Sequence, residues 1–309
     1  MTVLVLGGGL RGAAACYLAK KAGHRVILCD KKQKSPALGL CDEFVLFDPK
    51  NLPAADCVFP AAAEEALLAP FRGEKLLFDP LAQAVCRSKL AGDDYLEAHG
   101  YPHPQRFPRG SEPYIVKPDA DSYGRGIWAT EDFCEVGGAV NANFLTQEEL
   151  AGPVVSVTVW GRPGAYGCGP VLGLKTDDRY DLCEAFLPAP IPAEAAEAFA
   201  ADARRLAEEI GLEGILEVQA VFHGGKCKII EMNGHLPELS ALCLWAGAGI
   251  NLVQELMAPG AAAGELRPCR CLCRKNGEAV GRRSAGDAGP MQAADTGFGN
   301  AAFDLFIEI

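Results

Sequence analysis

The sequence predicts an α/β protein whose central region is of the mixed α+β kind, and two stretches carry this prediction. At the amino end, an apolar run at residues 3–6 precedes a glycine-rich turn, a helical segment and a second apolar run at residues 25–30. This is the order of a β-loop-α-β unit. At residues 214–240, two runs of alternating residues flank a glycine-bearing turn, which is the pattern of a β-hairpin.

The composition is that of a globular protein and argues against several classes. The chain of 309 residues is 49% hydrophobic and 22% charged, enough for two or three lobes. A net charge of −11 without a basic stripe argues against a nucleic-acid partner. No stretch reaches the roughly 20 apolar residues of a membrane helix, and the amino end lacks signal-peptide features. We therefore expect a cytoplasmic protein with no membrane partner.

The first unit carries Gly7, Gly9 and Gly12 in the G-x-G-x-x-G spacing, with Asp30 at the end of the second strand. This pattern is typical of a dinucleotide-binding turn, so an NAD(P)-dependent oxidoreductase is one alternative. Strands at residues 55–60 and 76–80 would extend the parallel sheet. The second mononucleotide-binding half of a dehydrogenase does not follow, however, and we place this alternative second.

Two lysines mark the middle of the chain. Lys89 lies in a segment predicted to be helical over residues 81–100, and Lys117 ends a strand predicted at residues 113–118. A small-residue loop follows Lys117. Glycines let backbone N–H groups approach a phosphate while an ammonium group supplies charge. The loop therefore fits phosphate binding, although a plain turn between two strands is the alternative.

An acidic connector at residues 146–152 precedes a strand at 154–161. The clearest helix spans residues 192–210, because a proline stands at its start and Gly211 ends it. Of the thirteen cysteines, Cys269, Cys271 and Cys273 would share one face of a strand. A soft-metal site is conceivable there, but no histidine lies nearby, and we expect free buried thiols.

The hairpin at residues 214–240 places apolar side chains from Leu216 to Phe222 on one face and Glu217 and Gln219 on the other. An odd-length loop would set Gln219 opposite Glu231 and Glu217 opposite Asn233, whereas an even loop would flip one set. Carboxylate and amide oxygens gathered in this way suit Mg²⁺. An ordinary solvated face is the alternative.

In this order the elements resemble the ATP-grasp superfamily of carboxylate–amine ligases over about residues 1–257. The resemblance rests on the glycine-rich first unit, the two lysines, the acidic connector and the hairpin ending in Ile-Ile-Glu-Met-Asn. It implies a Rossmann-like domain over residues 1–80, a two-part ATP-grasp domain over 81–258 and a small C-terminal lobe over 259–309.

Several segments resemble more closely the ligase family of pyrrolysine biosynthesis, which joins (3R)-3-methyl-D-ornithine to the ε-amine of L-lysine. They are GGGLRGAAACYLAKKAGHRVILCDK, SKLAGDDYLEAHGYPHPQ and RYDLCEAFLPAP. The resemblance implies ADP-forming amide synthesis through an acyl phosphate, with ATP and Mg²⁺ required. Another ATP-grasp ligase or a carboxylase for a small substrate is the alternative. The oligomeric state stays open, a homodimer included.

The resemblance also implies a role for particular residues. The nucleotide would be bound by Lys89, Lys117, Ser122, Gly124, Gly126 and the connector residues Gln147, Glu148, Glu149 and Leu150. The metal would be held by Gln219, Glu231 and Asn233. The two amino-acid substrates would be bound by Leu10, Arg11, Asp30, Glu64, Ser156, Thr158, Tyr180, Asp181, Glu217, His235, Pro237, Glu238 and Ser240. Glu217, Asp181 and Glu238 are equal candidates for the general base.

Three positions depart from the family pattern. Gln219 and Thr158 stand where the family usually has carboxylates, and His235 stands where it commonly has arginine. An amide oxygen still ligates Mg²⁺, so Gln219 lowers the charge of the site without removing a ligand. The departures at Thr158 and His235 concern the identity of the substrate more than the chemistry.

Overall fold

The computed structural model describes residues 1–61, 76–106, 113–119, 125–132, 143–258, 260, 264–275, 296–299 and 303–309. They group into two units. The first comprises Met1–Phe78, Glu184–Leu187 and Leu236–Ile309, and the second comprises Asp79–Cys183 and Pro188–His235. The predicted domain boundary at residue 80 lies near the boundary at Phe78. Residues 236–258, which we expected in the second domain, and residues from 259 onward, which we expected to form a separate lobe, are both grouped with the first unit.

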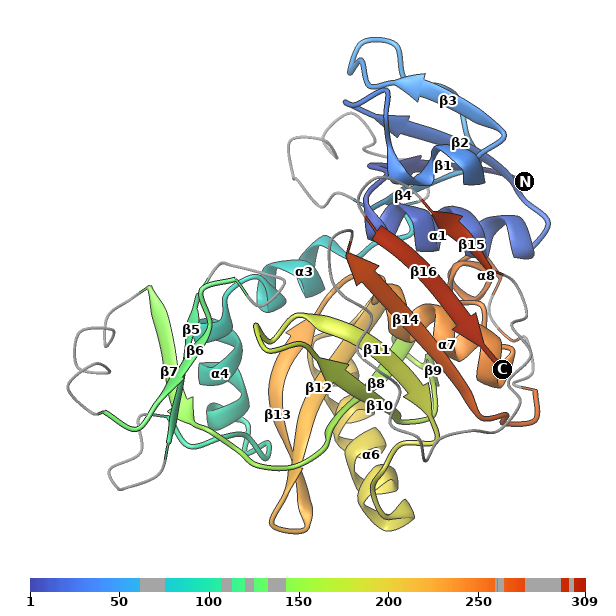
Figure 1. Ribbon diagram of the computed structural model, residues 1–309. Helices are drawn as coiled ribbons and strands as arrows, with labels where there is room; N and C mark the ends of the chain where they lie inside the picture. Colours follow the sequence, from blue (N-terminus) through green and yellow to red (C-terminus); the bar gives the residue numbers. More distant parts are fainter. Residues whose placement is uncertain are drawn as a thin grey trace. The chain divides into compact units, whose positions relative to one another are not determined.

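The first unit begins with a parallel sheet in the order β3-β2-β1-β4 (Figure 1). The amino-terminal elements are β1 (Thr2–Leu6), α1 (Leu10–Lys21), β2 (Arg25–Asp30), the 3₁₀ helix η1 (Pro36–Leu40), β3 (Glu43–Leu46) and β4 (Cys57–Pro60). The apolar runs of β1 and β2 are buried, as a parallel sheet requires. Of the strand expected at residues 76–80, only Leu76 pairs with the sheet, by a single parallel bridge to Val58, and Pro80 already begins a helix.

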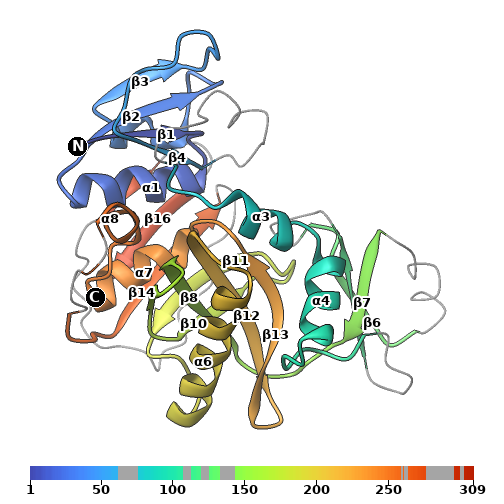
Figure 2. The same cartoon turned by 180° about the vertical axis from the view of Figure 1, so that it is seen from behind.

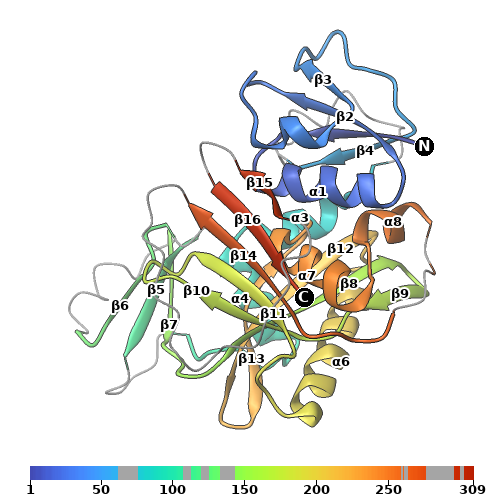
Figure 3. The same ribbon diagram turned by 45° about the vertical axis from the view of Figure 1, so that its right-hand side comes forward.

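The carboxyl-terminal part of the first unit adds helices and antiparallel strands. Its elements are α7 (Glu238–Ala248), α8 (Leu252–Met257), β14 (Cys269–Lys275), β15 (Thr296–Gly299) and β16 (Phe303–Glu308). Helix α1 packs against α7 and α8, while β14, β16 and β15 lie side by side (Figure 3). The cysteines of β14 are buried thiols that form no disulfide bond among the described residues, which confirms the expectation of buried thiols for this strand.

The second unit contains two sheets. Its elements are α3 (Pro80–Cys86), α4 (Lys89–Ala98), β5 (Tyr114–Pro118), β6 (Trp128–Thr130), β7 (Phe144–Glu148), β8 (Val154–Arg162), β9 (Ala165–Cys168), β10 (Leu172–Thr176), β11 (Leu182–Leu187), α6 (Ala193–Glu209), β12 (Gly214–His223) and β13 (Lys226–Asn233). The last four residues of β11 are counted with the first unit. One sheet has the order β6-β5-β7, and the other runs β13-β12-β8-β10 with β9 beside β8.

The helix expected over residues 81–100 is two helices, because the chain breaks at Ser88. The Ser88 hydroxyl accepts a hydrogen bond from the Ala91 backbone and caps α4. Lys89 therefore becomes the first residue of α4. Helix α6 forms where the sequence predicts it and packs against β8 and β13 (Figure 2). Among the described residues, no helix is long and apolar enough to cross a membrane.

The apolar face of the hairpin forms the core of the second unit. Leu216, Val218 and Ala220 are fully buried together with Val155 and Val157 of β8. The opposite face carries the polar residues in the predicted register: Glu217 pairs with Asn233, and Gln219 pairs with Glu231. The alternation predicted for β12 and the pairing predicted across the hairpin are both confirmed.

The loop of the hairpin has an even number of residues, although the predicted pairs required an odd number. His223 pairs with Lys226, so the turn consists of Gly224 and Gly225. Both glycines have positive φ, +58° and +81°, as in the two-residue turn that matches the twist of paired strands. The register then shifts by one residue at Ile230, and this β-bulge restores the predicted pairs.

Gly225→Val should destabilise the protein by about 1–2 kcal/mol, because a branched side chain strains a left-handed backbone. An added Cβ meets no atom within 4 Å there, so the loss reflects backbone conformation and not a clash. Gly224→Asn is the matched control, since asparagine tolerates this conformation. Urea denaturation measures both. Equal stability of Gly225→Val and the wild type would contradict the turn.

Candidate active site

The second unit brings Lys89 and Lys117 to the same part of β13. Lys89 Nζ lies 3.4 Å from Glu231 Oε1. Lys117 Nζ donates to the backbone oxygen of Ile230 at 3.4 Å and to Gln147 Oε1 at 3.1 Å. Lys89, Ile230 and Glu231 line one pocket of this unit. The bulge in β13 thus offers a backbone oxygen to one lysine beside the carboxylate that pairs with the other.

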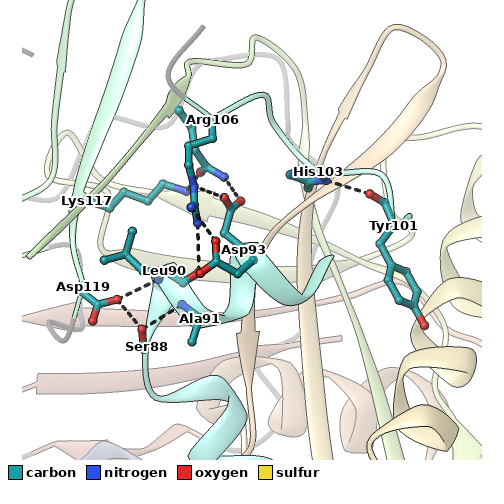
Figure 4. Close-up of polar contacts among 11 residues, drawn as sticks. Ser88, Leu90, Ala91, Asp93, Tyr101, His103, Arg106, Lys117 and Asp119 are labelled. Carbon is teal, nitrogen blue, oxygen red and sulfur yellow. Dashed lines mark hydrogen bonds and ion pairs between the residues drawn. The ribbon is translucent and has the colours of Figure 1, made fainter. Parts of the chain in front are cut away.

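Asp119 fastens the two lysine-bearing segments to each other. It follows β5, and its Oδ1 accepts hydrogen bonds from Ser88 Oγ and the Leu90 backbone, both at 2.8 Å (Figure 4). The start of α4 is therefore held at the end of the strand that carries Lys117. The sequence analysis did not single out Asp119, although a carboxylate two residues after Lys117 was a usable signal.

The loop after Lys117 is described only in part. Gly126 has a φ of +70°, and a Cβ there would lie 2.9 Å from Pro118 Cγ, so both its backbone conformation and its packing favour glycine. Ser122 and Gly124 lie outside the described residues, and their proposed contact with phosphate stays a prediction.

A series of buried, hydrogen-bonded polar side chains lies next to Lys117, and the sequence analysis missed most of its members. Asp93 accepts Gln147 Nε2 at 2.6 Å through Oδ1 and Arg106 Nε at 2.7 Å through Oδ2. Asp93 and Gln147 are 3% and 1% exposed. A carboxylate inside an amphipathic helix resembles an ordinary surface residue in sequence, which is why only the tertiary structure reveals Asp93.

Burial lowers the pKa of Lys117 to about 8. Nearby Glu231 opposes this shift, Lys89 adds to it, and Asp93 opposes it. At neutral pH the ammonium is therefore still charged, but it loses its proton much more easily than a surface lysine. An anion placed beside it would stabilise the charged form.

The polar side chains of the connector residues form hydrogen bonds within the second unit. Gln147 joins Lys117 to Asp93. Glu148 contacts Lys228 Nζ at 2.5 Å and the Gln105 backbone at 2.9 Å. Burial opposes a low pKa for Glu148, but these two hydrogen bonds bring the pKa below its ordinary value. Glu149 accepts a 3.4 Å bond from the Tyr180 hydroxyl.

The polar face of the hairpin continues onto β8. Ser156 lies opposite Gln219, and Thr158 lies opposite Glu217, so two rows of polar residues cross β8, β12 and β13. The rows are Ser156–Gln219–Glu231 and Thr158–Glu217–Asn233. Opposed residues in antiparallel strands point to the same side of the sheet. The structure thus brings these six predicted site residues together.

Glu217 determines how the amides of this face are turned. Its Oε2 accepts Gln219 Nε2 at 2.9 Å and Asn233 Nδ2 at 3.3 Å. Because an ionised carboxylate only accepts hydrogen bonds, both NH₂ groups face Glu217 and both amide oxygens face away. Among the described residues there is no group of three His, Cys, Asp or Glu side chains suited to a metal. A set of two amide oxygens and the Glu231 carboxylate still fits Mg²⁺ chemically.

Tyr180 lies in a tight loop with the one positive φ, +63°, among the described non-glycine residues. Asp177 Oδ1 closes the loop by accepting the backbone N–H groups of Arg179 and Asp181, each at 2.9 Å. Such a backbone conformation is rare for an aromatic residue and tends to occur where function requires it. The Tyr180 hydroxyl connects this loop to the connector through Glu149.

The remaining predicted substrate residues lie mainly in the first unit. Arg11 Nε lies 3.2 Å from Glu238 Oε1, and Arg11 also donates to the Ala61 backbone at 3.3 Å. Leu10 begins α1, Pro237 precedes α7, and Ser240 is buried within α7. His235 ends the second unit. Glu64 lies outside the described residues.

The backbone N–H groups in and near the glycine-rich turn find hydrogen-bond partners within the first unit. Asp30 Oδ2 accepts the Gly8 backbone N–H at 2.6 Å, and Oδ1 accepts that of Lys32 at 2.8 Å. A Cβ on Gly12 would lie 2.0 Å from the Gly7 oxygen, so this glycine serves close packing of α1 on β1. The fingerprint thus has a structural explanation that does not require a dinucleotide.

The curated proteins that are similar in sequence to the chain share one name. No family model matches the chain. It is 30% identical over 269 residues to the 3-methyl-D-ornithine–L-lysine ligase of Methanosarcina barkeri, covering 82% of this chain and 72% of the relative. The ligase of the same name from Methanosarcina mazei is 29% identical, with 82% and 71% covered.

Solved structures support the fold. An N5-carboxyaminoimidazole ribonucleotide synthetase from Thermus thermophilus has a TM-score of 0.76 at 16% identity, covering 98% of this chain and 93% of that one. An ADP complex of such a synthetase has a TM-score of 0.73 at 20% identity, covering 88% and 81%. The fold predicted from the sequence, ATP-grasp, is confirmed. By its identity to the Methanosarcina barkeri enzyme over most of both chains, the protein belongs to the 3-methyl-D-ornithine–L-lysine ligase family.

Proposed function

We propose that the protein is an ATP-dependent, ADP-forming ligase that joins (3R)-3-methyl-D-ornithine to the ε-amine of L-lysine in pyrrolysine biosynthesis. The relatives named for this reaction support the substrates. The observation that carries the chemistry is the meeting of Lys89, Lys117 and Glu231 beside the polar face of the hairpin. Cations and oxygen ligands so placed suit the transfer of a phosphoryl group.

The first step would be attack of the ornithine carboxylate on the γ-phosphoryl group of ATP. Lys89 and Lys117 would contact the phosphates and neutralise charge on the transferring oxygens. Mg²⁺, when bound, would be held by the oxygens of Gln219, Glu231 and Asn233 and would supply further charge neutralisation. The acyl phosphate would then be attacked by the lysine amine, with phosphate leaving. Positioning and electrostatics suffice for both steps, so no covalent enzyme intermediate is required.

The connector from Gln147 to Leu150 would border the adenine. Because the side chains of Gln147 and Glu148 are bonded within the unit, contact with the base would rest on the main chain and Leu150. The polar face would receive the ornithine-type substrate. Thr158 Oγ1 is buried without a hydrogen-bond partner among the described residues and would gain one from a bound ligand.

The lysine substrate would lie near Leu10, Arg11 and Asp30 of the first unit. The incoming ammonium must lose a proton before it attacks, and Glu217, Asp181 and Glu238 stay the candidates for the acceptor. Glu238 Oε1 lies 3.2 Å from Arg11 Nε. A cytoplasmic location and a homodimer likewise stay predictions.

Mass spectrometry of products from ATP, Mg²⁺, lysine and a panel of ornithines tests the proposal. We expect ADP to form only when lysine and an ornithine-type acid are both present, with an amide product equal in mass to both acids less one water. ADP formation with bicarbonate alone would favour a carboxylase instead. Binding of a nicotinamide cofactor without ATP binding would favour the oxidoreductase.

Glu231→Gln should lower turnover by about 100-fold or more, because it removes the charge that pairs with Lys89 and would hold Mg²⁺. Steady-state ADP release at saturating substrates measures this. Glu208→Gln, an exposed substitution on α6 of the same unit, is the control and should retain full activity. Wild-type turnover in Glu231→Gln would remove the hairpin from the mechanism.

Affinity for ADP should fall as the pH rises above about 8, since Lys117 loses its charge through its lowered pKa. Protonated Lys117 binds phosphate below this pKa, so the loss approaches about tenfold per pH unit above it. Isothermal titration calorimetry across this range measures it. Lys117→Arg keeps its charge at every pH tested and should lose this step. The same pH profile in both proteins would contradict the role of Lys117.

A further inference from the structure

The ammonium of Lys117 lies at one end of a chain of four polar side chains, Arg106–Asp93–Gln147–Lys117, within the second unit. Arg106 donates to Asp93, Gln147 donates to Asp93, and Lys117 donates to Gln147, at 2.7, 2.6 and 3.1 Å. Figure 4 shows the hydrogen bond from Arg106 to Asp93, with the side chain of Lys117 close by. Nothing in the reaction itself requires Asp93 to touch a substrate.

Because these side chains are buried, the direction of each hydrogen bond between them is determined. Asp93, Gln147 and Lys117 are 3%, 1% and 6% exposed, so each polar atom needs a protein partner of the correct kind. The carboxylate of Asp93 only accepts, so the NH₂ group of Gln147 must face it. The oxygen of the same amide then faces Lys117. With the amide reversed, an NH₂ group would face an ammonium, and two donors would oppose each other.

Arg106 fixes the far end of the chain. Besides Asp93, it donates to Asp94 Oδ1 at 2.6 Å and to the Leu90 oxygen at 3.1 Å, so three bonds hold the guanidinium. The backbones of Arg106 and Gln147 also pair in an isolated antiparallel β-bridge. The position of Asp93 is therefore determined by its neighbours before any ligand arrives.

The ammonium of Lys117 has three N–H donors in a tetrahedral arrangement. Two of them are directed at Gln147 Oε1 and the Ile230 oxygen. The third is then directed away from both oxygens. Orienting the Gln147 amide thus also orients the donor that remains for a phosphate.

We propose that Asp93 is a positioning residue that acts through Gln147 to aim Lys117 at a nucleotide phosphate. The inference rests on the proposed function, because it takes Lys117 to bind phosphate. Asp93 does not touch the nucleotide in this scheme. It sets the polarity of Gln147, and Arg106 holds Asp93 in place.

Asp93→Asn tests this scheme, because Arg106 and Gln147 bond to different oxygens of Asp93 and asparagine replaces one of these oxygens with an NH₂ donor. We expect the dissociation constant for ADP, measured by calorimetry on the full chain, to rise about tenfold. Asp94→Asn is the matched control: Asp94 also pairs with Arg106 but is largely exposed. Its ADP affinity should stay within about twofold of wild type. An equal loss in both variants would show that only anchoring of the helix matters and would overturn the proposal.

A double-mutant cycle with Lys117→Met separates positioning from general stability. If Asp93 acts through Lys117, adding Asp93→Asn to Lys117→Met should weaken ADP binding no further. A full additional tenfold loss would overturn the inference. Wild-type ADP affinity in Lys117→Met would instead refute the proposed role of Lys117 itself, so the two failures are distinguishable.

A double variant that reverses the hydrogen bond between residues 93 and 147 should restore binding, which a purely structural role does not explain. In Asp93→Asn with Gln147→Glu, the new amide can accept from Arg106 and donate to the new carboxylate, which can accept from Lys117. We expect ADP affinity to return to within about threefold of wild type. Each single variant leaves a mispaired group and should bind ADP weakly. A double variant that is well folded by circular dichroism yet binds as weakly as Asp93→Asn would contradict the proposal.

Discussion

The antiparallel pairing of β12 with β13 is the constraint on which the site depends. It buries one face of the hairpin against apolar residues of α6 and leaves the other face for Gln219, Glu231 and their neighbours. A two-residue glycine turn alone would put these residues out of register. The bulge at Ile230 corrects the register and also turns a backbone oxygen toward Lys117. One irregularity therefore aligns the proposed metal ligands and helps to hold a lysine.

Two charged side chains of the site, Lys117 and Asp93, are buried, and each has hydrogen-bond partners of the opposite kind. Lys117 is held by two oxygens, and Asp93 by an amide and a guanidinium. A buried charge without such partners would strongly favour its neutral form. Burial still lowers the pKa of Lys117, so an incoming polyphosphate would complete the pairing that the protein begins. This arrangement favours binding of an anion over an empty pocket.

The glycine-rich turn and the hairpin show that a sequence motif alone does not reveal whether its role is structural or functional. The turn matches a dinucleotide fingerprint, yet Asp30 and the packing of Gly12 account for its residues within the first unit. The hairpin resembled a plain solvated surface, yet its polar residues align in two rows with Ser156 and Thr158 of β8. Spacing alone could not separate these cases, because each depends on what packs against the motif.

The sequence by itself determined the elements whose signals are local. The alternation of β12, the parallel runs of β1 and β2 and the boundaries of α6 follow from residue order, because period and capping act over a few residues. Resemblance in motif order further identified the ATP-grasp fold, the lysines and the hairpin. Only the tertiary structure decided the break at Ser88, the bulge at Ile230 and the place of Asp93. Those features depend on hydrogen bonds between residues distant in the chain, such as Asp119 with Ser88 and Gln147 with Asp93.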